Sequence, residues 1–361
     1  MTGHNNTLIG YGAGTAITTG TWNTAIGYQA MNSNTVCAYN TAFGYQALYT
    51  QSNCPLCWDY GHTTESALNT AVGYKALYSS QAYGGCALGY LAGTSNHNGC
   101  SLIAVGEQAA MNNTDGNDNI AIGESALVGN TSLSDNVVLG THALELQTYN
   151  PGCTGGGVCT SSYNVAVGNW ALHSNQPTST SNGINNTALG YGAGYSNTTG
   201  YNNVFSGYQA GYSNTTGIAN NANGYTALHS NISGNYNNAN GRQSLYSNTT
   251  GVNNVANGTN TLFYNTSGSY NAASGVNALF YNTGSDNTAD GNQALYSNTT
   301  GSYNTGSGYD VLNTNTTGYQ NTGVGYLADV NANNLFNMTA IGNGAIASAT
   351  YPFMCGNTLV S

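Results

Sequence analysis

Residues 23 to 35 read NTAIGYQAMNSNT, and close variants of this stretch return along the whole chain. Each copy has an amide-rich start, a small apolar run, a glycine, often a tyrosine, and an amide-rich end. We take this glycine as the reference position of a repeat. The reference glycines are Gly10, Gly27, Gly44, Gly73, Gly89, Gly106, Gly123, Gly140, Gly168, Gly190, Gly207, Gly224, Gly241, Gly258, Gly275, Gly291, Gly308, Gly325 and Gly342. Of the eighteen steps between these nineteen glycines, thirteen are 17 residues, two are 16, and three are 29, 28 and 22.

The 17-residue period predicts the fold class. Helix-pair repeats need more than about 30 residues, and Gly, Asn and Thr are poor residues for helix interiors. We therefore predict an all-β parallel β-solenoid of about nineteen 17-residue coils, each hydrogen-bonded to the coils on either side. The whole chain, 1–361, is expected to form one solenoid array with insertions near 50–65, 147–160 and 174–183.

Composition limits the partners of the chain. Only 4 % of the residues are charged, with two cations and a formal net charge of -10. Because phosphate binding depends on clustered Lys and Arg, we expect no nucleic-acid partner and no anionic membrane surface. No stretch approaches about 18 consecutive apolar residues, so no membrane span is expected. The start, MTGHNNTLIG, lacks the basic and apolar regions of a signal peptide, so export is expected through a removed signal or another route.

Small and amide side chains recur at fixed positions and predict a narrow core. Alanine occupies most sites two residues before the reference glycine, and Ala-Leu pairs often follow it by three to four residues. Asparagine stands four residues before the glycine in sixteen of the nineteen repeats, where stacked amides would hydrogen-bond as a ladder. The asparagine-ladder candidates are Asn23, Asn40, Asn69, Asn119, Asn203, Asn237, Asn254 and Asn304.

A second asparagine file lies seven residues after the reference glycine in the C-terminal half of the chain. Its members are Asn197, Asn214, Asn231, Asn248, Asn265, Asn282, Asn298 and Asn315. All of them except Asn282 stand in N-x-Ser/Thr sequons. Two interpretations stay open at this point, namely turn residues that tolerate left-handed backbone and N-glycosylation sites.

Tyrosine follows the reference glycine in ten repeats and predicts a discontinuous, exposed ladder. The residues are Tyr11, Tyr28, Tyr45, Tyr74, Tyr90, Tyr191, Tyr208, Tyr225, Tyr309 and Tyr326. Rings on neighbouring coils would lie within offset-stacking range, worth about 0.5–1.5 kcal/mol per pair. We interpret the ladder either as aromatic stiffening of a surface or as a face that binds glycans or neighbouring fibres.

The residue just before the reference glycine is apolar over residues 1–200, polar over 201–310 and apolar again at the end. If the preceding alanine points inward, strand alternation turns this residue outward. Because such an apolar file is not normally left in water, it predicts a subunit interface. The alternative is that both positions are partly interior around a corner. The candidate interface residues are Ile9, Ile26, Phe43, Val72, Val105, Ile122 and Leu139.

Eight cysteines occur without an evident catalytic context. Cys153 and Cys159 flank a glycine run, and we expect them to form a local disulfide. Cys54 and Cys57 are the second candidate pair. The alternative for that pair is a zinc site made of Cys54, Cys57, His62 and Cys37. Disulfides would imply an extracellular or surface setting.

No arrangement typical of catalysis stands out, so we expect no enzyme, no cofactor and no resident metal. Of the six histidines only His173 and His229 share a repeat position, where solvated turn residues would explain them. Residues 115–118, DGND, could hold calcium. The glycine- and aspartate-rich nonapeptide of calcium-binding β-rolls is absent, which favours a solvated turn.

The cores NTAIGYQAM, NTAFGYQAL and NTAVGYKAL, with the later YSNTTGSYNT, resemble the head repeats of trimeric autotransporter adhesins. They also resemble repeat arrays of tail-fibre-like proteins whose precursors end in a self-cleaving intramolecular chaperone. The closing stretch AIGNGAIASATYPFMCGNTLVS is similar to the segment that precedes a stalk or chaperone domain in those families. The resemblance covers nearly the whole chain. It implies a left-handed parallel β-roll, often trimeric, exposed outside the cell and used for attachment.

The chain departs from those families in its longer coil, its eight cysteines and the lack of a coiled-coil stalk or anchor after Ser361. These departures favour end-to-end polymerisation, because the open strand edges of a solenoid can pair with the next chain. We therefore predict an extracellular filament or fibre subunit that assembles with itself and serves attachment or scaffolding on a cell surface, or on a virion surface. The alternative is a carbohydrate-binding tail fibre or trimeric adhesin head, whose insertions at 50–65 and 147–160 form a lateral site. A third hypothesis, charge hopping along tyrosine ladders, is disfavoured by the breaks at Glu107, Glu124, Thr141 and Asn169.

Overall fold

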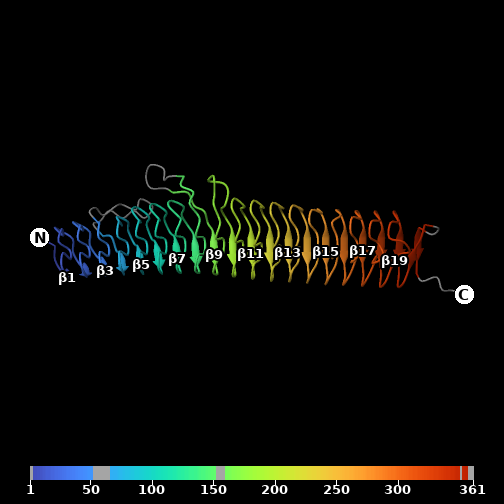
Figure 1. Cartoon of the computed structure of the whole chain (residues 1–361), viewed down its shortest axis with the longest axis horizontal. Coiled ribbons are helices and arrows are strands. Elements are labelled where there is room, and N and C mark those ends of the chain that lie inside the picture. Colours follow the sequence, from blue (N-terminus) through green and yellow to red (C-terminus); the bar gives the residue numbers. More distant parts are fainter. Residues whose placement is uncertain (1–2, 52–65, 152–158, 350–351, 357–361) are drawn as a thin grey trace. The chain divides into compact units, whose positions relative to one another are not determined.

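Short parallel strands joined by turns make up the chain, in a computed structural model that describes residues 3–51, 66–151, 159–349 and 352–356 (Figure 1). The chain divides into two compact units, Met1–Tyr191 and Gly192–Ser361. No helix occurs among the described residues. The predicted all-β parallel solenoid is confirmed in each unit, and the two units together hold about nineteen turns of about 17 residues.

Each coil contributes a strand that ends just before the reference glycine. The strands of the first unit are β1 (Thr7–Ile9), β2 (Thr24–Ile26), β3 (Thr41–Phe43), β4 (Thr70–Val72), β5 (Cys86–Leu88), β6 (Ile103–Val105), β7 (Ile120–Ile122), β8 (Val137–Leu139), β9 (Val165–Val167) and β10 (Thr187–Leu189). The strands of the second unit are β11 (Val204–Ser206), β12 (Asn221–Asn223), β13 (Asn238–Asn240), β14 (Val255–Asn257), β15 (Ala272–Ser274), β16 (Thr288–Asp290), β17 (Thr305–Ser307), β18 (Thr322–Val324), β19 (Asp329–Val330), β20 (Thr339–Ile341), β21 (Ile346–Ala347) and β22 (Phe353–Cys355). Strands β19 and β21 form a separate two-stranded parallel sheet.

Neighbouring strands pair in parallel with identical repeat positions side by side. Ala25 of β2 lies opposite Ala42 of β3 in the first unit, and Ala222 of β12 lies opposite Ala239 of β13 in the second. The long steps keep this register, since Ala42 pairs with Ala71 across the 29-residue step. The extra residues of this step therefore do not displace the next strand.

Left-handed backbone at four positions lets each coil close within about 17 residues. The reference glycines have φ between 118° and 146°, a region that other residues rarely adopt. In the repeat of Gly241 the further left-handed residues are Gln243, Leu245 and Asn253, with φ of 56°, 49° and 56°. A leucine in this region is strained, and complete burial of the Leu245 side chain offsets that cost.

The core of each unit is narrow, so that one large side chain requires a small one beside it. The alanine two residues before the reference glycine is almost fully buried in most coils. In the coil of Gly207 this position holds Phe205, which is fully buried. The same coil has Gly211 at a position where eleven of the other coils have leucine, and a Cβ on Gly211 would collide with the Phe205 ring. The two exceptions compensate each other in volume.

Of the three predicted insertions, only 174–183 lies wholly within the described residues. It extends from the coils of the first unit as a compact loop (Figure 1). Asn182 Oδ1 accepts hydrogen bonds from the backbone N–H groups of Thr178 and Ser179, at 2.9 and 3.2 Å. Pro177 is buried against Gly183 at the base of the loop. Residues 52–65 and 152–158 of the other two insertions lie outside the described part of the chain.

Candidate functional surfaces

The predicted asparagine ladder runs inside both units. Asn40 Nδ2 donates a hydrogen bond to Asn23 Oδ1 over 3.1 Å, and the backbone N–H of Asn40 donates to the same oxygen over 3.0 Å. The same two bonds join Asn254 to Asn237 in the second unit, both at 3.1 Å. All eight predicted members are at most 1 % exposed. The ladder therefore satisfies buried amides while it fixes the spacing of consecutive coils.

The second asparagine file is also an internal ladder, which neither sequence-based interpretation predicted. Its members do close turns, since Asn197 N–H donates to the Gly194 carbonyl at 3.0 Å, but their backbone is not left-handed. Asn214 Nδ2 donates to Asn197 Oδ1 over 2.8 Å, and all eight members of the file are fully buried with backbone that is not left-handed. An amide nitrogen that is buried and hydrogen-bonded cannot carry a glycan in the folded chain. In the first unit, sequence reasoning missed the continuation of this ladder. Its members there include Asn96, Asn113, Asn130, Gln147 and Asn175.

The tyrosines that follow the reference glycine form stacked runs on the surface. In the first unit, ring centroids lie 5.1–5.5 Å apart along the run Tyr11, Tyr28, Tyr45, Tyr74 and Tyr90. In the second unit the stacked pairs are Tyr208–Tyr225 at 5.3 Å and Tyr309–Tyr326 at 5.4 Å. The predicted ladder is thus present, with breaks at the coils that lack tyrosine.

Stacking determines which part of each tyrosine a ligand can reach. Interplanar angles of 6–16° in the first run place the rings nearly flat against one another. Both faces of an inner ring such as Tyr28 are therefore covered, and its 45 % exposure belongs to the ring edge and hydroxyl. Sugars pack against the faces of aromatic rings, so these runs favour the stiffening interpretation over glycan binding.

A longer aromatic ladder lies five residues after the reference glycine in the second unit. Seven rings on consecutive coils stack with centroids 5.0–5.3 Å apart, in the order Tyr195, Tyr212, His229, Tyr246, Phe263, Phe280 and Tyr296. Sequence reasoning missed this continuity because three residue types share one position. At the same position in the first unit, Tyr49 and Tyr78 stack at 5.0 Å.

The outward column just before the reference glycine is apolar on every strand of the first unit, while the other outward column holds threonine on β1 to β4 and on β10. In each strand the middle residue is the most buried one and its two neighbours point outward. Leu88 is 49 % exposed and Ile122 is 38 % exposed. Other members of the same column are half-buried, namely Ile26, Val72, Val105 and Leu139, so the column points outward but is partly covered on several strands. On β6 to β9 both outward columns are apolar, with Ile103, Val105, Ile120, Ile122, Val137, Leu139, Val165 and Val167.

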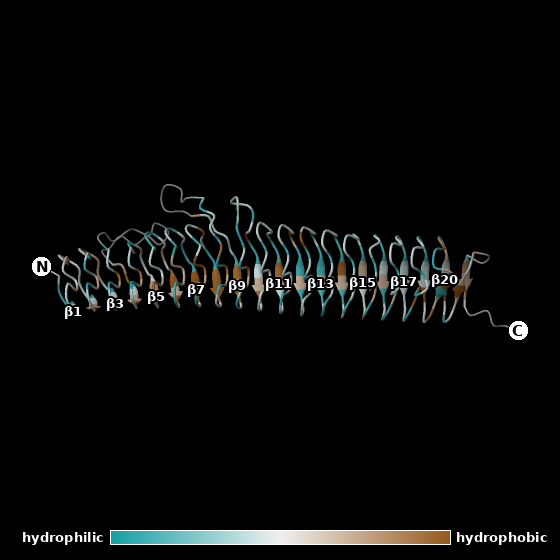
Figure 2. Cartoon of the chain, in the orientation of Figure 1, coloured by the Kyte–Doolittle hydropathy of each residue, from teal (hydrophilic) through white to brown (hydrophobic). Residues whose placement is uncertain are grey.

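The corresponding face of the second unit is polar on β12 and β13 (Figure 2). Asn221 Nδ2 donates to Asn238 Oδ1 over 3.2 Å, and Asn223 Nδ2 donates to Asn240 Oδ1 over 3.3 Å. These four amides are outward-facing members of exposed ladders. The outward sheet face of the first unit, with its apolar side chains, is suited to burial. The amide side chains of the corresponding face on β12 and β13 are suited to contact with water.

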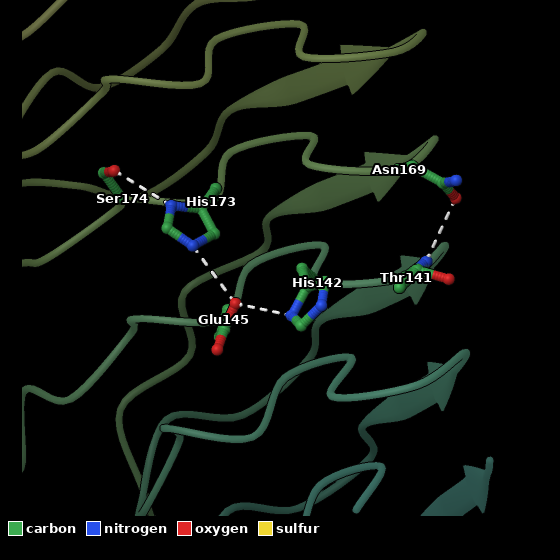
Figure 3. Close-up of polar contacts among 6 residues, drawn as sticks. All are labelled: Thr141, His142, Glu145, Asn169, His173 and Ser174. Carbon is green, nitrogen blue, oxygen red and sulfur yellow. Dashed lines mark hydrogen bonds and ion pairs between the residues drawn. The ribbon is translucent and has the colours of Figure 1, made fainter. Parts of the chain in front are cut away.

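A cluster of ionisable side chains joins two neighbouring coils of the first unit (Figure 3). Glu145 Oε2 lies 2.8 Å from His142 Nδ1 and 3.1 Å from His173 Nε2. Trp170 stacks on His142 with ring centroids 4.4 Å apart and lies 4.9 Å from the His173 ring. His173 Nδ1 lies 3.1 Å from Ser174 Oγ. Because the His173 side chain is only 12 % exposed, its description as a solvated turn residue is wrong.

Burial sets the protonation of two histidines. Desolvation lowers the pKa of His173 and outweighs the charge and hydrogen bond of Glu145, which raise it, while His142 lowers it further. Desolvation also lowers the pKa of His229 within the aromatic ladder of the second unit. Both imidazoles are therefore neutral at neutral pH. A neutral His173 that donates from Nε2 to Glu145 can accept from the Ser174 hydroxyl at Nδ1.

Acidification is expected to destabilise the folded chain as the pH falls below the ordinary histidine value of about 6.5. In that range the unfolded chain binds a proton at His173 that the folded chain resists, so stability is lost as the pH falls from the unfolded toward the lower folded pKa. Urea unfolding over a pH series measures this slope. His173→Gln should reduce this slope of stability against pH. His229→Gln should reduce the same slope by a further, independent amount. A slope unchanged by both substitutions would contradict these assignments.

Of the two candidate metal sites, only the calcium turn lies within the described residues. The zinc alternative would use Cys54, Cys57 and His62, which lie outside them. At the candidate calcium turn the Asp115 carboxylate accepts hydrogen bonds from Asn98 Nδ2 at 2.7 Å and Thr114 Oγ1 at 2.9 Å. Within the described ranges no group of three or more His, Cys, Asp or Glu side chains converges on a metal site.

The disulfide predictions also extend beyond the described residues. Cys153, Cys54 and Cys57 lie outside them, so both pairs remain predictions. Cys86 on β5 and Cys355 on β22 carry free, exposed thiols. The described segments contain no helix that is long and apolar enough to span a membrane.

No protein-family model matches this chain, and no curated protein matches it either. The resemblance to adhesin head repeats and tail-fibre-like arrays therefore stands at the level of the fold alone. At that level each unit is a parallel β-solenoid with internal asparagine ladders and external tyrosine stacks.

Proposed function

We propose that the chain is a structural subunit of an extracellular fibre, which binds copies of itself and serves attachment or surface scaffolding. The observation that supports this most is the apolar sheet face of the first unit, which is exposed in the single chain. Soluble monomers rarely leave a continuous apolar surface larger than a few hundred Å² in water. A second copy of the same chain offers a face of matching chemistry and the same coil spacing.

The interior of each unit suits a structural role. Backbone hydrogen bonds join consecutive coils at several points, for example Thr24 N–H to the Asn40 carbonyl at 2.9 Å and Gly27 N–H to the Ile9 carbonyl at 2.8 Å. Two asparagine ladders add side-chain hydrogen bonds between the same coils. Stability in such arrays is a sum over neighbouring coils, so each additional coil adds to the total stability of the array. The described surfaces carry few charges that would bring a soluble substrate to the protein.

End-to-end assembly is the second part of the proposal. Among the described residues, β1 pairs only with β2 and β22 pairs only with β20. A parallel strand with one free side can pair with a strand of another chain. Side-by-side contact through the apolar face and end-to-end contact through strands would together give a fibre. A trimer of the adhesin type is one arrangement in which the apolar face would be covered.

Sedimentation velocity of the full chain tests the proposal. We expect an oligomer that the pair Leu88→Lys and Ile122→Lys disperses, because unpaired charges are costly to bury. The matched control places lysines at Asn223 and Asn240 of the polar face and should leave the oligomer intact. Cys86, exposed on β5 of the apolar face, should react with maleimide more slowly in the assembled state. A chain that sediments as a monomer at all concentrations, with Cys86 fully reactive, would contradict the proposal.

A further inference from the structure

The seven-ring ladder of the second unit is an unbroken series of ring contacts. It spans seven consecutive coils from Tyr195 to Tyr296, and every centroid distance along it is 5.0–5.3 Å. All of its rings are half-buried. In contrast, the series of tyrosines after the reference glycine is interrupted in the same unit by Arg242, Thr259, Val276 and Asn292.

The distribution of phenols along the ladder follows a rule. Two coils carry phenylalanine in the ladder, Phe263 and Phe280, and only in those coils is the next residue a tyrosine, Tyr264 and Tyr281. The other five coils have serine at that next position, namely Ser196, Ser213, Ser230, Ser247 and Ser297. At these two positions taken together, six of the seven coils therefore hold one phenol, and the seventh holds the imidazole of His229.

The two displaced tyrosines remain in contact with the ladder. Tyr264 and Tyr281 stack on each other at 5.4 Å, and each stands edge-on to its own phenylalanine at 4.8 Å. Tyr281 then contacts Tyr296 at 5.3 Å, which returns the series of phenols to the main ladder. Packing alone would be satisfied by the phenylalanines, so the added tyrosines keep a phenol beside the ladder in the two coils where phenylalanine occupies it.

Tyrosine is one of the two side chains that are most readily oxidised by one electron, and electron transfer is fast between aromatic rings in contact. We propose that this ladder relays oxidising equivalents along the second unit, from a one-electron oxidant of the haem-peroxidase or metal-polypyridyl class at one end to tyrosines at the other. This activity is independent of the proposed fibre function, since it needs only one chain.

The relay step is balanced within the ladder. The oxidant takes one electron from a phenol, whose proton leaves to water at the exposed ring edge, and a neutral tyrosyl radical forms. A neighbouring phenol then gives an electron to that radical and a proton to water, while the first oxygen regains a proton from water. Each hop thus restores one tyrosine and creates one radical. The neutral His229 ring lies in the gap between Tyr212 and Tyr246, at 5.3 and 5.0 Å from them.

A photosensitiser placed beside one end of the ladder tests the relay. Asn313 occupies the same repeat position on the coil after Tyr296, and it accepts a hydrogen bond from Ser297 Oγ at 2.9 Å. An azidophenylalanine at position 313 of the full chain would carry a ruthenium polypyridyl complex, which an oxidative quencher converts to the Ru(III) oxidant after a flash. A nitroso spin trap then marks the radicals, and peptide mass spectrometry locates the adducts. We expect adducts at the far end, on Tyr195 and Tyr212, as well as near the label.

Three variants separate a relay from random oxidation. Tyr246→Phe keeps the stack but leaves two consecutive ladder positions, 229 and 246, without a phenol, so the adducts on Tyr195 and Tyr212 should be lost. Adding His229→Tyr to that variant should restore them. Tyr225→Phe removes an exposed phenol outside the ladder and should change nothing. Adducts confined to the labelled end in the unsubstituted ladder, or far-end adducts that persist in Tyr246→Phe, would overturn the proposal.

Discussion

Replacing Asn237 by leucine is expected to lower the free energy of unfolding by about 3 kcal/mol, since each buried group left without a partner costs about 1–3 kcal/mol. The Asn237 Oδ1 atom accepts hydrogen bonds from both the backbone N–H and the Nδ2 of Asn254. Its Nδ2 donates to the Gly251 carbonyl at 2.8 Å and to Asn220 Oδ1 at 3.2 Å. Leucine has a similar shape but replaces none of these four bonds. Urea unfolding measures the loss.

The matched control for this prediction is Asn240→Leu. Asn240 lies in the same coil, three residues further on at the end of β13, but its side chain is exposed on the outward face. Substitutions at such exposed positions usually stay within about 0.5 kcal/mol. Hydrogen exchange gives a second, local measurement, because the N–H of Asn254 loses its acceptor only when Asn237 is replaced. Equal effects of the two substitutions would mean that the internal ladder does not hold the coils together.

The reference glycines should be the least replaceable residues of the chain, and Gly106→Ala is the sharpest test. A Cβ at Gly106 would lie 2.6 Å from the Gly123 carbonyl oxygen and 2.7 Å from its carbon, both in the next coil. Neither atom can move without breaking the stack. The left-handed φ of 131° adds a backbone cost of about 1–3 kcal/mol. We expect unfolding of the coils around Gly106, measured as loss of hydrogen-exchange protection there.

Gly84→Ala separates the collision from the backbone strain. Gly84 also has positive φ, 71°, but a Cβ there would meet no atom closer than 3.9 Å. Its replacement should therefore cost only the strain term of about 1–3 kcal/mol and leave the coils paired. If Gly106→Ala were no more harmful than Gly84→Ala, the close approach of glycines in successive coils would not be a requirement of the fold.

The repeated coil was predictable because its determinants are local and recur at one spacing. The buried alanine column and the asparagine four residues before Gly27 or Gly241 can be aligned by eye, and parallel stacking then brings them into register. The outward direction of Ile122 followed from strand alternation alone. These predictions needed no knowledge of any contact between distant parts of the chain.

Features that mix residue types at one position were not predictable in the same way. The internal ladder of the first unit uses Gln147 between Asn130 and Asn175, and a search for asparagine alone does not find it. The long aromatic ladder alternates among tyrosine, histidine and phenylalanine. In each case the shared property is the ability to hydrogen-bond or stack with the next coil, which becomes visible only once the coils are superposed.

The histidine cluster was missed for a different reason. Glu145 and His173 are 28 residues apart in sequence, because an insertion separates two coils that are adjacent in space. Only the register across that insertion places both side chains at the same repeat position. Sequence reasoning located the insertion but did not compare the residues on its two sides.

One repeat of the second unit is a residue shorter than the usual 17, and this shortening has a consequence that was not predicted from the sequence. The step from Gly275 to Gly291 is 16 residues, and Asn282 of that coil donates to the Gly284 carbonyl. Asn265 Oδ1 in the preceding coil is buried without a hydrogen-bond partner. The strands still pair in register, with Ala273 opposite Ala289, so the deletion breaks one ladder and leaves the sheet intact.

Diffraction from oriented samples of the purified protein tests most directly the central claim that consecutive 17-residue repeats are stacked coils. Parallel strands that stack one per repeat predict a strong reflection near about 4.8 Å along the stacking direction. A reflection near the helical pitch of about 5.4 Å, or none near the strand spacing, would contradict the stacked-coil structure and the surfaces derived from it.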